Sequence, residues 1–312
     1  MHPVLFEVAG LPVYSYGVML GTSLVVAWYV VMYLGTRKEG LTREVMGTTF
    51  IITALVALLM ARVLYVATNP DEFHQLSDFF AFRSGGLVAY GGFLGGLLGS
   101  WLYLRRRDDA TLLGWADVTA PTLGLGLGFT RIGCYLFGCD FGAPLTESAP
   151  QFLRDWGTFP HWDNGDGSPA FVHHVTTYDL SPLARYSLPV HPTQLYESAF
   201  GFVLAAIAFA VWQRRRFRGQ VILIVAGLYG VWRFFIEYVR DDPERGEYFG
   251  FSTSQWISLA LVPIVGFLYH QLSKKPSPLV APTPEPVAAT AGAAASPARS
   301  GTGKRTKKKK KK

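Results

Sequence analysis

Three arginines lie inside long apolar stretches of this 312-residue sequence, at Arg62, Arg131 and Arg233. A guanidinium keeps its charge, and at bilayer depth it costs several kcal/mol or more unless it is paired or faces a wet cavity. Arg233 precedes Glu237 by four residues, so a helix would place both on one face. Such buried cations are suited to holding an anion, and the abundant anion of a membrane is a lipid phosphate. A purely structural ion pair is the alternative.

Arg62 is expected to have a structural role. It would either snorkel toward an interface or pair with Asp117 of a later apolar stretch.

The segment around Arg131 reads TRIGCYLFGCDFG at 130–142 and is rich in glycine. Glycines such as Gly133 and Gly142 expose backbone amides, and amides together with a guanidinium can grip phosphate oxygens. These positions are therefore candidate substrate-binding residues. A glycine-rich packing seam is the alternative reading.

The two cysteines of the chain, Cys134 and Cys139, are five residues apart. On a continuous helix that spacing separates them by about 140°, so they would not bridge unless the helix breaks at Gly138. Two cysteines alone indicate a metal site only weakly. They are otherwise explained as small packing residues.

Further polar candidates lie at the predicted outer ends of the apolar stretches. Tyr90, among glycines, would hydrogen-bond a substrate or belong to the aromatic belt. In HPTQLYE at 191–197, His191 could act as a base or as a phosphate donor, whereas Gln194 could contact substrate. The alternative is that His191, Gln194 and Glu197 cap a helix. Tyr16, at the outer end of the first apolar run, could line the same substrate cavity as these residues.

Composition places the chain among polytopic membrane proteins. Half of its residues are apolar, only 16% are charged, and there are 33 glycines. Residues 1–273 carry 18 basic and 21 acidic side chains, so the overall charge of +7 comes from the tail, and nucleic acid is not an expected partner. We predict an integral membrane domain at 1–273 and a disordered basic tail at 274–312.

Seven apolar runs are long enough to span a bilayer, which takes a helix of about 20 residues. They lie near 13–35, 46–68, 85–104, 112–138, 192–213, 220–240 and 254–272. The odd-numbered connections between them are basic and the even-numbered ones are not. The positive-inside rule therefore predicts an extracytoplasmic N-terminus and a cytoplasmic C-terminus.

The connection at about 140–190 is long and rich in Pro, Trp, Asp and Gly. That composition predicts a small, loop-rich cap on the outer face. His161, His173 and His174 within it are expected to be ordinary surface or loop residues. No internal repeat stands out, which argues against transporter folds built from repeated halves.

The ordered set of motifs resembles the bacterial prolipoprotein diacylglyceryl transferases. The motifs run over nearly all of residues 1–272 and are YGVM, ARVLYV, the glycine-rich third span, ADVTAP leading to RIG, HPTQLYE, and YGVWRFFIE. The resemblance implies an all-α, seven-helix enzyme of the bacterial inner membrane without a metal or organic cofactor. It would transfer the diacylglyceryl group of phosphatidylglycerol to the lipobox cysteine of a prolipoprotein, giving a thioether and glycerol 1-phosphate.

The resemblance also assigns roles to single residues. Arg131 matches the signature arginine that contacts phosphatidylglycerol, Arg233 and Glu237 match a pair needed for activity, and Tyr16 matches a tyrosine near the cavity. Tyr90 stands where some members carry a histidine proposed as base. The base is therefore left open among Tyr90, His191 and Glu237.

The family signature GRxGNFxNxE is altered in this chain. Thr130, Cys134, Phe137 and Cys139 replace its first Gly, two Asn and Glu. Asp140 could supply the lost carboxylate. These departures keep two alternatives open, namely a non-catalytic lipid-binding relative and a transporter of an anionic lipid or solute.

Overall fold

The structure is a computed structural model that describes residues 2–8, 10–39, 41–73, 79–80, 86–161, 167–241, 246–274 and 279. The predicted tail at 274–312 lies outside these ranges except for Lys274 and Leu279. So do Arg83, which lies between the second and third predicted runs, residues 162–166 of the predicted cap, and residues 242–245, which lie between the last two predicted runs.

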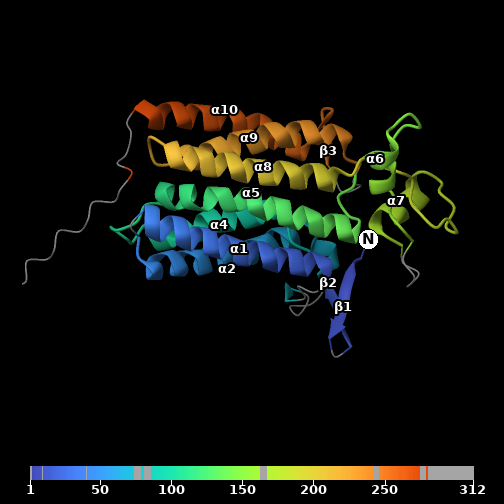
Figure 1. The fold of residues 1–312 in the computed structure, drawn as a ribbon, viewed down its shortest axis with the longest axis horizontal. Coiled ribbons are helices and arrows are strands. Elements are labelled where there is room, and N and C mark those ends of the chain that lie inside the picture. The colour runs from blue at the N-terminus through green and yellow to red at the C-terminus, as the bar shows by residue number, and fades with distance from the viewer. Residues whose placement is uncertain are drawn as a thin grey trace, which may run out of the picture. The chain divides into compact units, whose positions relative to one another are not determined.

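Long helices, lying side by side in Figure 1, make up most of the described chain. They are α1 (Ser15–Lys38), α2 (Arg43–Thr68), α4 (Ala89–Leu104), α5 (Leu112–Phe137), α8 (Thr193–Arg214), α9 (Gln220–Ile236) and α10 (Thr253–Lys274). Helix α5 has a central place because it packs against α1, α4, α8 and α9. Helix α2 packs against α1 and α4, and α10 packs on α9.

Shorter elements gather at one end of the helices (Figure 1). They are the antiparallel hairpin β1 (Val4–Val8) and β2 (Leu11–Tyr14), the 3-10 turns η1 (Pro70–Glu72) and η3 (Glu237–Val239), the helices α6 (Gln151–Trp156) and α7 (Pro169–Thr177), and the antiparallel pair β3 (Glu247–Tyr248) and β4 (Phe251–Ser252). Between α5 and α8, a small apolar cluster of Phe141, Phe159, Ala170 and Val190 holds this region together.

Five helices of the described residues are long and apolar enough to cross a membrane, namely α1, α2, α8, α9 with η3, and α10. The chain is therefore a multi-pass membrane protein. The seven predicted runs each overlap one of the long helices. Helix α4 has only 16 residues, and α5 carries Asp117, Pro121 and Arg131 within its length. Neither is among the five.

Glycines set the close contact between α5 and α8. A Cβ atom built on Gly124 would lie 2.6 Å from the Ala205 nitrogen, and one on Gly201 would lie 2.6 Å from the Gly128 nitrogen. Only hydrogen at these positions lets the two backbones approach so closely. This contact matters for function because α5 and α8 carry facing members of the charged site described below.

A polar cluster around Asp117 lies at the end of the helices away from the cap, and its role is structural. The Asp117 carboxylate is fully buried and accepts hydrogen bonds from the backbone amides of Gly219, Val221 and Ile222, at 2.8–3.0 Å. It also pairs with Arg215, which contacts Glu39 as well. A carboxylate of α5 thereby caps the first turn of α9, where the helix dipole favours a negative charge.

This arrangement overturns one sequence-based expectation. Asp117 pairs with Arg215 and not with Arg62. Arg62 is only 2% exposed, so it does not snorkel either. Its guanidinium donates 2.9 Å hydrogen bonds to the carbonyls of Phe79 and Gly86. The structural role expected for Arg62 is compatible with these contacts, although its partners differ from those predicted.

Candidate functional site

Three arginines and three carboxylates meet, among the described residues, where α5, α8 and α9 end near the cap segment. They are Arg131, Arg233, Arg240, Asp140, Glu197 and Glu237. Glu197 is central because its carboxylate contacts all three arginines. It pairs with Arg131 through the guanidinium Nε, with Arg233 at 3.2 Å and with Arg240 at 3.0 Å. Arg131 and Arg233 therefore share one carboxylate and lie in a single site.

The one-face pattern of α8 explains why Glu197 reaches this position. Gln194, Glu197, Ser198 and Gly201 are all buried and follow the spacing of a single helical face. Ser198 donates a 2.9 Å hydrogen bond to the Gly128 carbonyl, which anchors that face on α5. The Glu197 side chain then points to the arginines, and its burial, at 2% exposure, requires that it be paired.

The predicted pair of Arg233 and Glu237 is present, with 3.0 Å between Nη2 and Oε2. Arg233 also donates a 3.0 Å hydrogen bond to the Ser254 hydroxyl at the start of α10. The Tyr90 hydroxyl, at the start of α4, donates to the same Ser254 oxygen over 3.2 Å. Tyr90 and Arg233 are therefore linked through the Ser254 hydroxyl. The Tyr90 side chain is partly exposed.

The loop after α5 carries Asp140 into the site. Helix α5 ends at Gly138, which has a left-handed φ of 87°, and Asp140 follows with φ of 57°. The carboxylate of Asp140 lies 2.8 Å from Arg131 and 2.7 Å from Arg240. Burial by itself would raise the pKa of Asp140, but the charges of Arg131 and Arg240 outweigh it and hold that pKa below its usual range. Asp140 is therefore ionised at neutral pH.

Side chains at the start of α8 hold this loop in place by donating hydrogen bonds to the backbone carbonyl groups of the loop. The fully buried Gln194 donates a 2.7 Å hydrogen bond from its amide to the Cys139 carbonyl. Thr193 donates a 2.8 Å hydrogen bond to the Asp140 carbonyl. Gln194 therefore positions the loop that carries Asp140, because its side chain is buried and does not contact solvent.

His191 and Gly142 lie where the loop, α8 and η3 come together. The Gly142 amide donates to the His191 carbonyl at 3.0 Å, and the His191 amide donates to Ala143 at 3.0 Å. Gly142 also forms a β-bridge with Arg240. The His191 ring packs edge-on against Tyr196, and burial lowers the pKa of His191, so the ring is neutral at pH 7.

Gly133 brings the start of α1 against α5. A Cβ atom on Gly133 would lie 3.0 Å from the Tyr16 Cα atom and 3.2 Å from its Cδ2 atom. Tyr16 itself is 42% exposed at the first turn of α1. The structure therefore places Tyr16 against α5 at Gly133, two residues after Arg131 in the sequence.

The histidines of the cap segment correct another expectation. His173 and His174 lie in α7, and His174 is fully buried instead of being a surface residue. Its Nδ1 accepts a 3.1 Å hydrogen bond from the Leu188 amide, and burial lowers its pKa to about 4. His161 packs its ring against Phe171. These contacts are those of residues that hold the cap together.

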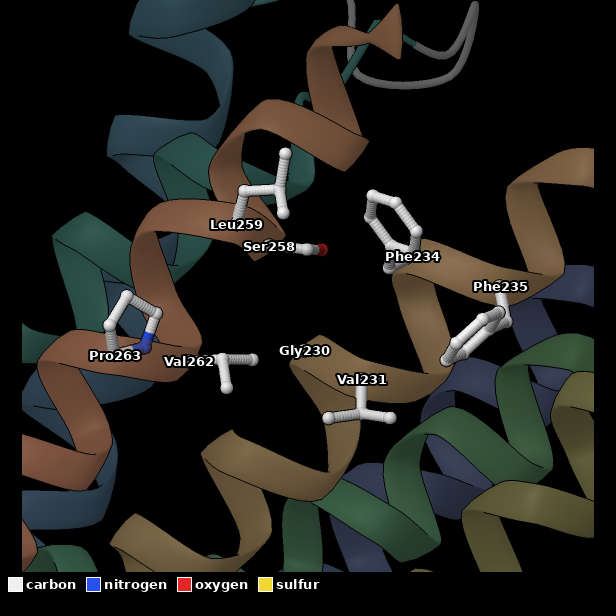
Figure 2. Close-up of a pocket in the computed structure, with 8 residues that line it drawn as sticks. All are labelled: Gly230, Val231, Phe234, Phe235, Ser258, Leu259, Val262 and Pro263. Carbon is white, nitrogen blue, oxygen red and sulfur yellow. The ribbon is translucent and has the colours of Figure 1, made fainter.

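An apolar pocket of about 230 Å³ opens between α9 and α10, next to Arg233 in sequence. Figure 2 shows its lining side chains facing each other across the two helices, with Phe234 and Phe235 on α9 and Leu259 and Val262 on α10. It is distinct from the charged cluster, because none of its lining residues is charged.

The chain matches the sequence model of the family described as prolipoprotein diacylglyceryl transferase over residues 3–270. The chain belongs to this family. The match covers every described helix that contributes to the charged cluster, so the resemblance inferred from the motifs is confirmed.

Curated family members share about a third of the sequence or slightly less. A phosphatidylglycerol–prolipoprotein diacylglyceryl transferase of Clostridium tetani is 30% identical over 272 residues, which cover 86% of this chain and 97% of the relative. A Clostridium perfringens protein with that name and the number 2 is 32% identical over 275 residues, covering 88% and 96%. A Clostridium botulinum relative is 28% identical over 282 residues, covering 88% and 99%.

Two residues of the charged cluster, Glu197 and Arg240, are not predicted from the sequence as partners of Arg131 and Arg233. Glu197 was considered a possible helix cap, although its one-face spacing with Gln194 and Gly201 signals a buried contact face. Arg240 was not considered, although it follows Arg233 by seven residues and Glu237 by three, which is again one helical face. Asp140, which could supply the lost carboxylate of the signature, pairs with Arg131 and Arg240.

Gly142→Ala is expected to lower activity by about tenfold to a hundredfold, because misplacing a site by about 1 Å can cost 10²-fold. The added Cβ atom would lie 2.5 Å from the Val239 carbonyl oxygen and 2.7 Å from both the Cβ and the carbonyl oxygen of His191, so the segment bearing Arg240 must shift. Transfer rates of the purified variant measure the effect. Gly126→Ala is the matched control, since nothing lies within 4 Å of its added Cβ. Equal rates for the two variants would show that the close approach at Gly142 is dispensable.

Proposed function

We infer that this chain is a phosphatidylglycerol–prolipoprotein diacylglyceryl transferase, the enzyme of the first step of lipoprotein maturation. It transfers the diacylglyceryl group of phosphatidylglycerol to the thiol of a lipobox cysteine and releases glycerol 1-phosphate. The observation that carries this proposal is the meeting of Arg131 and Arg233 on one buried carboxylate. Family membership and the names of the curated relatives support the reaction.

The reaction is a substitution at the glycerol carbon that bears the headgroup phosphate. The substrate thiol, with an ordinary pKa near 8.5, loses its proton, and a new carbon–sulfur bond forms as the carbon–oxygen bond to phosphate breaks. The leaving group is a phosphate monoester, so negative charge develops on its oxygens. Fixed guanidinium groups stabilise that charge without having to reorganise.

Exposure distinguishes the three arginines of the cluster. The side chains of Arg131 and Arg233 are 17% and 16% exposed, whereas that of Arg240 is 4% exposed. Arg131 and Arg233 therefore have edges that a phosphate can reach, and we assign them to the lipid headgroup. Arg240 positions Glu197 and Asp140. Arg131 leads the substrate-binding set, which also includes Tyr16, Gly133, Gly142 and Gln194, the last three acting through the backbone positions they fix.

Proton removal from the substrate thiol falls to Tyr90, His191 or Glu237. Tyr90 is partly exposed and connects to Arg233 through the Ser254 hydroxyl. The neutral His191 ring is able to accept a proton. Glu237 is paired with Arg233 and buried. We favour His191, because its neutral ring can accept a proton, whereas the Tyr90 hydroxyl already carries a proton and donates it to Ser254.

The apolar pocket between α9 and α10 suits an acyl chain of the same lipid. Its lining includes Phe234, which follows Arg233 directly in the sequence, together with Val231 and Val262. A headgroup phosphate held by Arg233 would leave the acyl chains beside this surface. We propose that membrane lipid reaches the charged cluster along it.

We propose seven membrane spans in the bacterial inner membrane, with the N-terminus outside and the C-terminus in the cytoplasm. The start of α1 and the cap helices α6 and α7 lie at one end of the helices, and α10 ends at the other (Figure 1). The basic connection at 214–218 lies between α8 and α9, at the end away from the cap, as the positive-inside rule requires. The cap at about 140–190 would then cover the site from outside.

One assay tests the function. Purified full-length protein is mixed with phosphatidylglycerol vesicles and a lipobox peptide, and mass spectrometry follows the peptide. The proposal requires the diacylglyceryl mass on the peptide cysteine, and none when phosphatidylcholine replaces phosphatidylglycerol. Folded protein that binds phosphatidylglycerol without forming the thioether would instead be the non-catalytic relative suggested by the altered signature. Lipid movement between leaflets without the thioether would favour a transporter.

A further inference from the structure

The two cysteines of the chain lie side by side next to the charged cluster, because α5 ends between them. Gly138 has a left-handed backbone, and the amides of Gly138 and Cys139 both donate to the Cys134 carbonyl, at 2.7 and 3.2 Å. This type of helix end brings the residue after the glycine back over the last turn. The helix break that a contact between the cysteines requires is therefore present.

The sulfur atoms are close enough for a covalent bond after side-chain rotation. The Cys134 and Cys139 sulfurs and a carboxylate oxygen of Asp140 all lie within 4.8 Å of one another. Both thiols are free. A disulfide needs Cα atoms about 4.4–6.8 Å apart, and the hydrogen bond from the Cys139 amide to the Cys134 carbonyl holds the two residues together across the helix end. A metal ion fits less well, because the Asp140 carboxylate already pairs with Arg131 and Arg240, whose charges repel a cation.

The two thiols differ in access and in electrostatic surroundings. Cys134 is 5% exposed, whereas Cys139 is partly open to solvent. The Arg131 Nη1 atom lies 4.0 Å from the Cys134 sulfur, whereas the Asp140 carboxylate lies 3.7 Å from the Cys139 sulfur. A pair with one accessible thiol and one buried thiol near a cation has the form of an attacking and a resolving cysteine.

We propose that Cys134 and Cys139 form a reversible intrachain disulfide on reaction with a low-molecular-weight disulfide. The Cys139 thiolate attacks one sulfur of the oxidant and releases its first thiol, which leaves a mixed disulfide on Cys139. The Cys134 thiolate then attacks the Cys139 sulfur and releases the second thiol. The oxidant is reduced to two thiols, and the protein loses two hydrogen atoms. Reduction by excess dithiol reverses both steps.

Closing this bond would disturb the charged cluster. The sulfurs must approach to about 2.05 Å, which turns the Cys139 side chain away from the Asp140 carboxylate that it contacts at 3.7 Å. Asp140 is the next residue in the chain, and its carboxylate bridges Arg131 and Arg240. The reduced pair is therefore the active form and the oxidised pair is the inactive one. This consequence for activity rests on the proposed function, whereas the disulfide itself does not.

Thiol counting tests the disulfide, because the full-length chain has no other cysteine. Purified protein is treated with oxidised glutathione, alkylated, and weighed intact. We expect two alkylated thiols before oxidation, none after it, no attached glutathione, and recovery with dithiothreitol. Cys134→Ala should stop at one attached glutathione on Cys139. Wild-type protein that keeps two alkylatable thiols, that retains glutathione, or that forms only crosslinked dimers would overturn the proposal.

Transfer rates test the regulatory consequence separately. Oxidised wild type is expected to lose about tenfold or more of its rate and to recover on reduction, since a displacement of about 1 Å can cost up to 10²-fold. Cys139→Ala should show no change on the same treatment. A disulfide that forms while the rate stays within about twofold would overturn the regulatory part alone. Reduced wild type without any transfer would count against the proposed function and leave the disulfide result intact.

Discussion

Arg131→Ala is expected to lower the turnover of lipobox peptide by about 10² or more, by analogy with the loss of one oxyanion donor. Arg131 has a partly exposed guanidinium, and Asp140 and Glu197 hold it in place from two sides. Removing it leaves the developing charge on the departing phosphate with one fewer fixed donor. Arg131→Lys should recover only part of the rate, because an ammonium lacks the planar fork. The assay is thioether formation at saturating phosphatidylglycerol.

The matched control for Arg131 is Arg154→Ala. Arg154 belongs to α6, and among the described residues its guanidinium donates to the carbonyls of Thr146 and Glu147 in the cap segment. It should turn over peptide at nearly the wild-type rate. If Arg131→Ala stays within about twofold of wild type while eluting as folded protein, Arg131 has no part in the chemistry.

Glu197→Ala is expected to destabilise the protein by about 3–5 kcal/mol and to abolish transfer, because removing one partner of a buried ion pair leaves charge uncompensated. Glu197 contacts all three arginines of the cluster, and two carboxylates would remain for three guanidinium groups. Thermal unfolding in detergent measures the stability. Glu197→Gln keeps the volume and one acceptor oxygen, so it should lose less stability than the alanine variant.

Glu147→Ala serves as the control for Glu197, since its side chain lies on the exposed surface of the cap segment. Its melting temperature should match that of wild type. A Glu197→Ala protein that melts with the wild type would mean that the cluster is not held together by this carboxylate. The arginines would then have to be oriented by Asp140 and Glu237 alone.

The helices could be predicted from the sequence because length and apolarity decide which segments fit a bilayer. Each predicted run coincides with a long helix, although five of them satisfy the requirements for a span. The pairing of Arg233 with Glu237 was also predictable, because four residues of helix put the two side chains on one face. Local geometry is sufficient for such contacts.

Contacts between distant segments could not be predicted in the same way. Glu197 meets Arg131 only because glycines at positions such as Gly124 and Gly201 let α5 and α8 approach, and spacing along one helix carries no information about that. The prediction that Asp117 pairs with Arg62 was wrong for the same reason. The observed partner, Arg215, is almost a hundred positions from Asp117 along the chain. The side-by-side cysteines depended on a helix end at Gly138, which a sequence pattern allows but does not require.

The most direct test of the account is a double-mutant cycle on Arg131 and Arg233. Initial rates of thioether formation are measured against the fraction of phosphatidylglycerol in vesicles for wild type, Arg131→Ala, Arg233→Ala and the double variant. If both arginines hold one phosphate, each single variant should lose about 10² or more in kcat/KM, and the double variant should lose far less than the product, because groups that act as a unit are not additive. Fully multiplicative losses, or a single variant that keeps its rate, would contradict a shared phosphate site.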